Sequence, residues 1–303
     1  MGVIEGEGGS ALAKLGNIKL SEAARGLALA MPPLAYTLLL LAVPILAVIY
    51  LSFTAREPDA DGNMVMSFAN YVRVWTDPLY LHLLARSVGI SVIVAVITVV
   101  LAYPIAYFIA FESGKWRHLW ILLITVPFWT SYLLRVLSWK IALGQSGAIN
   151  SILLWTGLTA TPFEGLLYNI GAVVTVLAHS YAVFAILPIY VSLVRLDRSL
   201  LEAATDLGDG AVRRFLRITL PLTQRGVVGA LMVVMIPTAG DYVTPVLIGG
   251  KDGIMIANQI QAQFGKANNW PLGAALSVST MLTIGFAALA ILVLARKAGR
   301  LAR

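Results

Sequence analysis

Residues 198–221 read RSLLEAATDLGDGAVRRFLRITLP and lie between two long apolar stretches. Ser199 followed three residues later by Glu202 is the pattern of a capping box, which predicts the start of a short helix. Gly208 suits the left-handed conformation that ends many helices. A second short helix is expected to follow directly and to stop by Pro221. The segment therefore predicts a helix–turn–helix outside the bilayer, in which two adjacent alanines allow another surface to approach closely.

Six stretches around this segment are apolar over about 20 residues, the length that crosses a bilayer. They are residues 26–53, 88–111, 119–137, 170–194, 226–248 and 272–295. The third is interrupted at its outer end by polar residues from Thr130 to Arg135. The shorter stretch 144–158 is broken by Gly and Asn, so an external re-entrant or surface helix is expected there. These stretches predict an all-α polytopic membrane protein with six transmembrane helices.

The composition supports a membrane solvent, because 59% of the residues are hydrophobic and 12% are charged, whereas soluble domains carry about 25% charged residues. If both termini are cytoplasmic, 15 of the 22 Lys and Arg residues lie in the inner segments, as the positive-inside rule requires. Their scatter between apolar runs favours topology signals over nucleic-acid binding, despite the net charge of +7. Residues 1–25 are then a cytoplasmic tail, and residues 26–303 are the transmembrane domain.

The segment resembles the EAA loop of binding-protein-dependent ABC importer permeases, whose motif is E-A-A, three residues, G, nine residues, I, one residue and L-P. The matching positions are Glu202, Ala203, Ala204, Gly208, Ile218, Leu220 and Pro221. The resemblance implies a type I ABC importer permease (MetI-like) fold, in the inner membrane of a bacterium. It also implies that residues 195–225 couple the chain to a separate cytoplasmic ATPase.

The same resemblance implies the other members of an assembly: a second homologous permease subunit, two ATPase subunits, a periplasmic substrate-binding protein and membrane lipid. The chain is expected to bind no cofactor itself, with ATP and Mg²⁺ on the partner ATPase. Its nearest approach to a P-loop is Gly265-Lys266, but Ile260 stands at the first glycine position and Ala267 replaces Ser or Thr.

Within this family the chain looks most like the spermidine/putrescine permeases of the PotB/PotH type. The features that carry this likeness are Pro104 in a YPIAY run, the segment 240–250 (GDYVTPVLIGG), and the segment 269–273 (NWPLG). The likeness implies a polyamine or related small cationic amine as substrate. Permeases for ferric iron, phosphonates and opines share much of the pattern, so these substrates stay open as alternatives.

Asp241 is the acidic residue that lies inside an apolar run, where an ionised carboxylate costs a few kcal/mol unless it faces water, a partner or a substrate. Pro237, Gly240 and Pro245 flank it and weaken the helix. Asp241 with the Tyr242 ring beside it would suit an ammonium group. The alternatives are that Asp241 caps a broken helix, or pairs with Arg135 or a partner subunit.

Three further residues are candidates for the substrate pathway. Trp129 and Tyr132 could add aromatic walls, although such residues also serve as interfacial anchors or packing groups. His179 lies in the middle of the fourth apolar stretch, where a lone histidine commonly makes one interhelical hydrogen bond. The acidic residues Glu57, Asp59, Asp61 and Asp77 of the first outer loop could meet the binding protein.

Two other function classes fit less well. An ion-coupled secondary transporter should carry more buried ionisable groups and an internal repeat. An intramembrane enzyme should carry a catalytic motif, but the sequence has no G-x-S-x-G and no H-E-x-x-H, and its three histidines fall in separate segments. No catalytic residue and no metal site are therefore predicted, and with no cysteine the redox compartment stays undetermined.

Overall fold

The computed structural model describes residues 22–55 and 65–301, and every named element in these ranges is a helix. The elements are α2 (Glu22–Ser52), α3 (Ala69–Thr76), α4 (Pro78–Tyr107), η1 (Phe108–Glu112), η2 (Gly114–Trp116), α5 (Arg117–Thr125), η3 (Val126–Trp129), α6 (Tyr132–Leu143), α7 (Ala148–Trp155), η4 (Glu164–Leu166), α8 (Ile170–Val194), α9 (Arg198–Asp206), α10 (Ala211–Arg214), η5 (Phe215–Thr219), α11 (Leu220–Ala239), α12 (Val243–Ile248), α13 (Ile256–Phe264) and α14 (Trp270–Leu301).

The chain divides into two units, Met1–Tyr50 and Leu51–Arg303. Helix α2 supplies the described part of the first unit. Most of the predicted N-terminal tail, and the predicted acidic positions Glu57, Asp59 and Asp61, lie outside the described residues. The second unit holds all the other helices.

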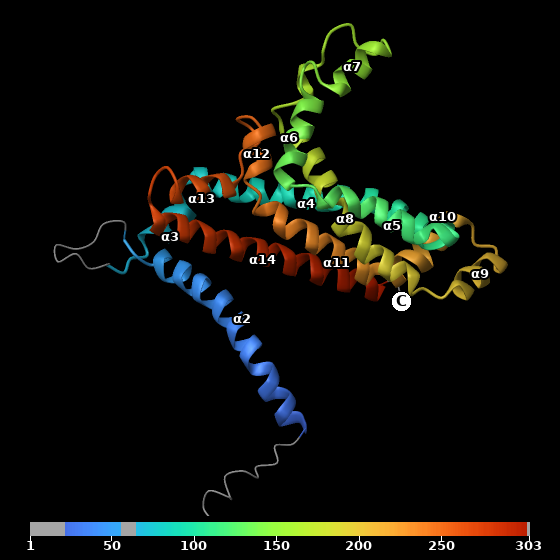
Figure 1. Cartoon of the computed structure of the whole chain (residues 1–303), viewed down its shortest axis with the longest axis horizontal. Coiled ribbons are helices and arrows are strands. Elements are labelled where there is room, and N and C mark those ends of the chain that lie inside the picture. The colour runs from blue at the N-terminus through green and yellow to red at the C-terminus, as the bar shows by residue number, and fades with distance from the viewer. Residues whose placement is uncertain (1–21, 56–64, 302–303) are drawn as a thin grey trace, which may run out of the picture. The chain divides into compact units, whose positions relative to one another are not determined.

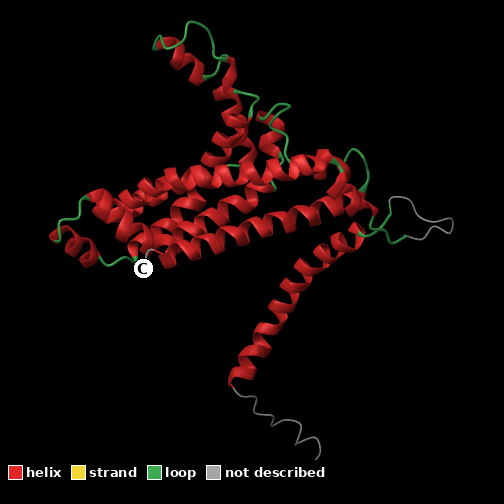
Figure 2. Ribbon diagram, turned by 180° about the vertical axis from the view of Figure 1, so that it is seen from behind, coloured by secondary structure: helices red, strands yellow, loops and turns green. Residues whose placement is uncertain are grey.

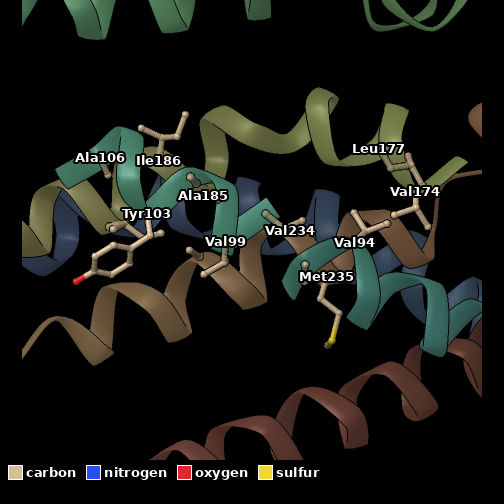
Figure 3. Close-up of a cluster of buried hydrophobic side chains, with 14 of the residues drawn as sticks. Val94, Val99, Tyr103, Ala106, Val174, Leu177, Ala185, Ile186, Val234 and Met235 are labelled. Carbon is tan, nitrogen blue, oxygen red and sulfur yellow. The ribbon is translucent and has the colours of Figure 1, made fainter. Parts of the chain in front are cut away.

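The centre of the second unit is a bundle of α4, α8 and α11, which pack against one another, with α14 alongside α11 (Figure 1). Their contact surface is apolar, and Figure 3 shows side chains of all three helices meeting in it, among them Val94, Leu177 and Val234. Several of the buried residues are alanines, such as Ala106 and Ala185. Small residues let helix backbones come close together, which is how helices associate in lipid.

Helices α8 and α11 lie close together at Gly226. A Cβ atom placed on Gly226 would lie 2.1 Å from the Ser192 hydroxyl and 2.7 Å from the carbonyl oxygen of Pro188. No side chain fits there, so the glycine sets the distance between the two helices at this point. A hydrogen bond of 2.8 Å between the hydroxyls of Tyr103 and Thr223 joins α4 to the same part of α11.

Five helices in the described ranges are long and apolar enough to span a membrane: Leu29–Ser52, Pro78–Glu112, Ile170–Val194, Ala211–Ala239 and Trp270–Lys297. A bent pair of segments, Gly114–Trp129 and Tyr132–Trp155, brings the number to six if the pair counts as one span. The predicted helical stretches 26–53, 88–111, 170–194 and 272–295 are thus confirmed as apolar helices. The sidedness of the termini stays a prediction.

The third predicted stretch, 119–137, is not one straight helix. It breaks at Thr130 and Ser131, and the segments on either side meet at 90°. Pro127 has no N–H to continue an α-helix, and the Thr130 hydroxyl donates to the Pro127 carbonyl at 2.7 Å. Such a side-chain bond competes with the helical ladder, so the interrupting polar residues end the helix instead of merely weakening it.

The fifth predicted stretch, 226–248, also differs from the structure. Helix α11 begins earlier, at Leu220, and ends at Ala239, after which α12 starts separately at Val243. Pro237 and Gly240 lie at the break, as the sequence predicts, and the N–H of Gly240 donates to the Pro237 carbonyl at 3.2 Å. The predicted weak point is therefore a true break between two helices.

Two features project from the bundle, one from its side and one from its end. Helices α6 and α7 stand away from it near α12, and α9 and α10 lie at the end where α14 finishes (Figures 1 and 2). The short helix predicted in residues 144–158 is confirmed as α7. Its position outside the membrane stays a prediction.

Candidate functional site

The connector between α8 and α11, residues 197–219, is here named the elbow. It begins with α9, which is capped by Asp197: the carboxylate accepts a hydrogen bond from the Ser199 N–H at 3.0 Å. The predicted capping box of Ser199 and Glu202 is therefore wrong. Asp and Ser are about equally good caps, and Asp197 comes first along the chain. The backbone hydrogen bond from Ser199 lowers the pKa of the Asp197 carboxyl from its usual value.

Helix α9 ends as the sequence predicts. Gly208 has φ of +86°, in the left-handed region. Its N–H donates to the Thr205 carbonyl at 2.9 Å, and the N–H of Asp209 donates to the Ala204 carbonyl at 3.0 Å. These two bonds form a Schellman motif, which satisfies carbonyls that the helix end would leave without partners. The turn is thus specified by one glycine.

The second half of the elbow differs from the prediction. Helix α10 does not stop at Pro221; the chain continues through η5, a π-helical turn, directly into α11. Pro221 lies in the first turn of α11, where a helix needs no N–H donor. Pro221 therefore follows the π-helical turn within a continuous helical segment and does not end a helix.

The EAA-motif residues fall on two sides of the elbow. Glu202, Ala203 and Gly208 are exposed, whereas Ala204 is buried. Ile218, Leu220 and Pro221 are half-buried at the entry to α11, and Leu220 packs against the bundle core. Of the two alanines expected to admit another surface, only Ala203 faces outward, because Ala204 lies on the inner face of α9 with Leu201.

Large apolar side chains stand out from the elbow on both sides of Gly208. Leu207 is 88% exposed and Val212 is 73% exposed. Leu207 lies between the membrane-length helices Ile170–Val194 and Ala211–Ala239. Burying a leucine fully is worth roughly 1.5–3 kcal/mol. In the chain alone, both side chains are left without that burial.

The two helices of the elbow are tied to each other. The Arg214 guanidinium donates to the Thr205 hydroxyl, and Arg213 forms an ion pair of 3.7 Å with Asp209. The Arg214–Thr205 contact crosses the turn at Gly208 and holds α10 against α9, whereas the Arg213–Asp209 pair lies entirely after the turn.

The second candidate site is at the break between α11 and α12. Asp241 is 7% exposed. Its Oδ1 accepts from the N–H groups of Val243 at 2.8 Å and Thr244 at 3.3 Å, and its Oδ2 accepts from the Thr244 hydroxyl at 3.0 Å. The carboxylate therefore caps α12, which is one of the roles expected from the sequence. Arg135 donates instead to the carbonyls of Ser180, at 3.2 Å, and Thr130, at 3.4 Å.

Tyr132 joins Asp241 from the far side of the bend in the third apolar segment. Its hydroxyl donates to Oδ2 of Asp241 and lies 2.6 Å from the hydroxyl of Thr244. Its ring centroid is 6.5 Å from that of Tyr181 on α8. Three helices, α6, α8 and α12, thus meet around one carboxylate, and the bend at Thr130 places Tyr132 where it can reach that carboxylate.

The other predicted pathway residues lie apart from this cluster. His179 accepts a hydrogen bond at its Nδ1 from the Trp139 indole at 3.1 Å, which is the interhelical bond expected of a lone histidine. Trp129 is 75% exposed and Tyr242 is 47% exposed. Tyr242 contributes its backbone carbonyl, which accepts from the Asn258 side chain at 2.8 Å.

The sequence reasoning missed Thr244, which contacts Asp241 through both backbone and hydroxyl. The signal was present, since a Thr three residues after an Asp at a helix start is a common capping arrangement. The Asn258 contact had no comparable signal, because it joins residues 16 positions apart across a loop.

Comparison with known proteins gives the following. The chain is 36% identical over 243 residues to the spermidine/putrescine transport system permease protein PotB of Salmonella typhimurium (strain SL1344), covering 80% of this chain and 84% of that protein. It is 33% identical to PotB of Haemophilus influenzae, covering 78% and 82%. No family model matches the chain.

Among solved structures, a bacterial alginate ABC transporter in complex with an alginate pentasaccharide-bound periplasmic protein contains a chain of similar fold. The TM-score is 0.69 at 15% identity, and the match covers 90% of this chain and 94% of that chain. At this identity the likeness concerns the fold alone.

Proposed function

The chain belongs to the family of spermidine/putrescine transport-system permeases, the multi-pass inner-membrane subunits of ABC importers, and we propose that it forms half of a translocation pathway driven by a separate ATPase. A second, homologous permease subunit supplies the other half. Two ATPase subunits bind ATP and Mg²⁺ and carry out hydrolysis, so this chain itself is not catalytic. A periplasmic binding protein delivers the substrate.

The elbow is the observation that carries this proposal. It is a preformed turn that exposes Glu202, Ala203 and the apolar Leu207 side by side. An exposed leucine beside small and acidic residues fits a groove on a soluble protein better than it fits water or lipid headgroups. Because α9 and α10 connect α8 directly to α11, a force applied at the elbow acts on two membrane helices at once.

The proposal places the elbow and both termini in the cytoplasm. The chain has no cysteine, so single cysteines can be introduced for labelling. Asp206→Cys in the elbow should react with a membrane-impermeant maleimide only after the inner membrane is permeabilised, and Lys251→Cys should react in intact spheroplasts. The reverse pattern would refute the orientation.

Coupling is tested in the assembled complex by charge reversal. Glu202→Arg should abolish uptake and reduce capture of the ATPase subunit during purification, because the reversed charge lies on the exposed face of α9. Asp252→Arg, an exposed acidic residue far from the elbow in sequence, is the control and should retain the ATPase. Equal capture and uptake in both variants would contradict a docking role for the elbow.

For the substrate we propose a polyamine or a related small cationic amine. The names of the relatives support this class, and so does the carboxylate of Asp241 at a helix break. The test uses the reconstituted transporter with the binding protein encoded beside it. Spermidine or putrescine should stimulate ATP hydrolysis, and stimulation only by a phosphonate, an opine or a ferric complex would assign the substrate to one of those classes instead.

A further inference from the structure

The first residue of α9, Arg198, reaches across to the end of another span. The Arg198 guanidinium donates hydrogen bonds to the backbone carbonyls of Ala110 and Phe111, each at 3.4 Å. It also stacks on the Phe111 ring, 5.4 Å from the centroid. Ala110 and Phe111 belong to η1, the π-helical turn that ends the span Pro78–Glu112. These contacts join segments separated by 87 and 88 positions in the chain.

The receiving carbonyls are ones that a helix end leaves without partners. The last four carbonyls of a helix lack intrahelical donors, and here the helix ends at Glu112. The Ser113 hydroxyl donates to Ile109 at 2.6 Å, Arg117 donates to Ala110 at 3.0 Å, and Arg198 serves Ala110 and Phe111. A cation at this position also favours the negative end of the helix dipole.

We propose that Arg198 is a positioning residue that fastens α9 to the end of the α4–η1 span. This inference rests on the proposed function and adds a third helix to it. Through the chain itself α9 is connected to α8 and, by way of α10 and η5, to α11; through Arg198 it is also connected to the end of the α4–η1 span. A displacement of α9 then moves all three helices of the central bundle together.

The guanidinium is suited to this role for a geometric reason. It presents several N–H donors in a plane, so it can bond two successive carbonyls while its face lies on an aromatic ring. A lysine at the same position keeps the charge but is a point donor. Arg198→Lys should therefore be intermediate between the wild type and Arg198→Gln.

The decisive experiment measures transport per ATP hydrolysed in the reconstituted complex. Arg198→Gln should lower this ratio about tenfold, the lower end of the range for losing one charge-assisted contact, while the ATPase subunit still co-purifies. Arg296→Gln, an exposed arginine of α14, is the matched control and should keep the wild-type ratio. A wild-type ratio in Arg198→Gln would overturn the proposal.

A second variant shows whether the contact with η1 is responsible. Phe111→Leu removes the ring under the guanidinium, and its effect should not add to that of Arg198→Gln, because both variants break one contact. Additive effects would mean that Arg198 acts elsewhere.

Spin labels at Lys115→Cys and Asp206→Cys provide a readout besides transport. The distribution of distances between the two labels should broaden in Arg198→Gln, and an unchanged distribution would also count against the proposal.

The outcomes separate this inference from the proposed function. If the wild-type chain fails to bind any ATPase subunit, the proposed function fails before Arg198 is tested. If Arg198→Gln alone releases the ATPase, Arg198 belongs to the docking surface and the fastening role is refuted. Only retained ATPase with a lowered ratio supports the connection from α9 to η1.

Discussion

The elbow exposes an apolar side chain to solvent, whereas the Asp241 cluster buries a charged one. In the elbow, an apolar side chain, Leu207, is left 88% exposed although the turn beneath it is fully hydrogen-bonded. At the membrane break, the carboxylate of Asp241 is 7% exposed and accepts bonds from Val243, Thr244 and Tyr132. The difference agrees with the proposed roles, because a docking surface leaves apolar groups for its partner to cover, whereas a charge inside a bilayer needs partners within its own chain.

We expect the largest loss of uptake from a substitution that changes the backbone conformation of the elbow. Gly208→Val places a β-branched side chain at φ +86°, a conformation that costs an L-residue about 1–2 kcal/mol, and should reduce uptake to background while membrane insertion persists. Gly210→Val is the matched control, since Gly210 has φ of −67° and open space at its Cβ position. Uptake is measured for both variants. Equal uptake would show that the left-handed conformation of Gly208 is not required for transport.

The exposed leucine gives the next largest effect. Leu207→Asn should weaken binding of the ATPase subunit about 10- to 100-fold, because it removes roughly 1.5–3 kcal/mol of apolar burial on docking. The affinity is measured by titrating purified ATPase onto the permease pair in nanodiscs. Leu216 is an exposed leucine in η5, and Leu216→Asn tests whether the effect belongs to the tip of the elbow; equal losses would extend the docking surface to η5.

The membrane cluster is tested by separating charge from shape. Asp241→Asn keeps an oxygen to cap α12 but removes the charge, and Thr244→Val keeps the charge but removes one hydroxyl. If the charge attracts a cationic substrate, Asp241→Asn should lower substrate-stimulated ATP hydrolysis about tenfold, in the range of a charged hydrogen bond, with a smaller change in Thr244→Val. Similar dose–response curves for both variants and the wild type would make Asp241 a capping residue alone.

The smallest expected effect is the pH dependence of the elbow. Because the folded-state pKa of Asp197 is lowered, its cap stabilises α9 above the unfolded pKa of about 3.9, and this stabilisation is lost as the pH falls through the folded value. A spin label at Asp206→Cys should become more mobile on acidification below about pH 4. Asp197→Asn keeps a good cap without a titrating group and should remove most of that dependence.

Local rules predicted one part of the structure well. Gly208 was predicted to be left-handed from its place after nine helical residues, and the four stretches of uninterrupted apolar sequence became helices. The misassigned cap shows the limit of such rules: Asp197 and Ser199 are both good N-cap residues two positions apart, and choosing between them requires the backbone conformation before the helix.

Contacts between distant positions were beyond the sequence. Tyr132 and Asp241 are 109 positions apart, and Arg198 and Phe111 are 87 apart. Aromatic and charged residues in these places fitted interfacial anchoring equally well, since one sequence says nothing about which side chain reaches which neighbour. The 90° bend at Thr130 decided the first contact, and the π-helical turn η1, whose free carbonyls have no sequence signature, decided the second.

The missing side chain of Gly226 has a mechanical consequence. With the backbones of α8 and α11 this close beside Pro188 and Ser192, neither helix can slide past the other without first separating. We therefore expect the two helices to move as one unit with the elbow, and the breaks at Thr130 and Gly240 are the places where the chain can bend during a transport cycle.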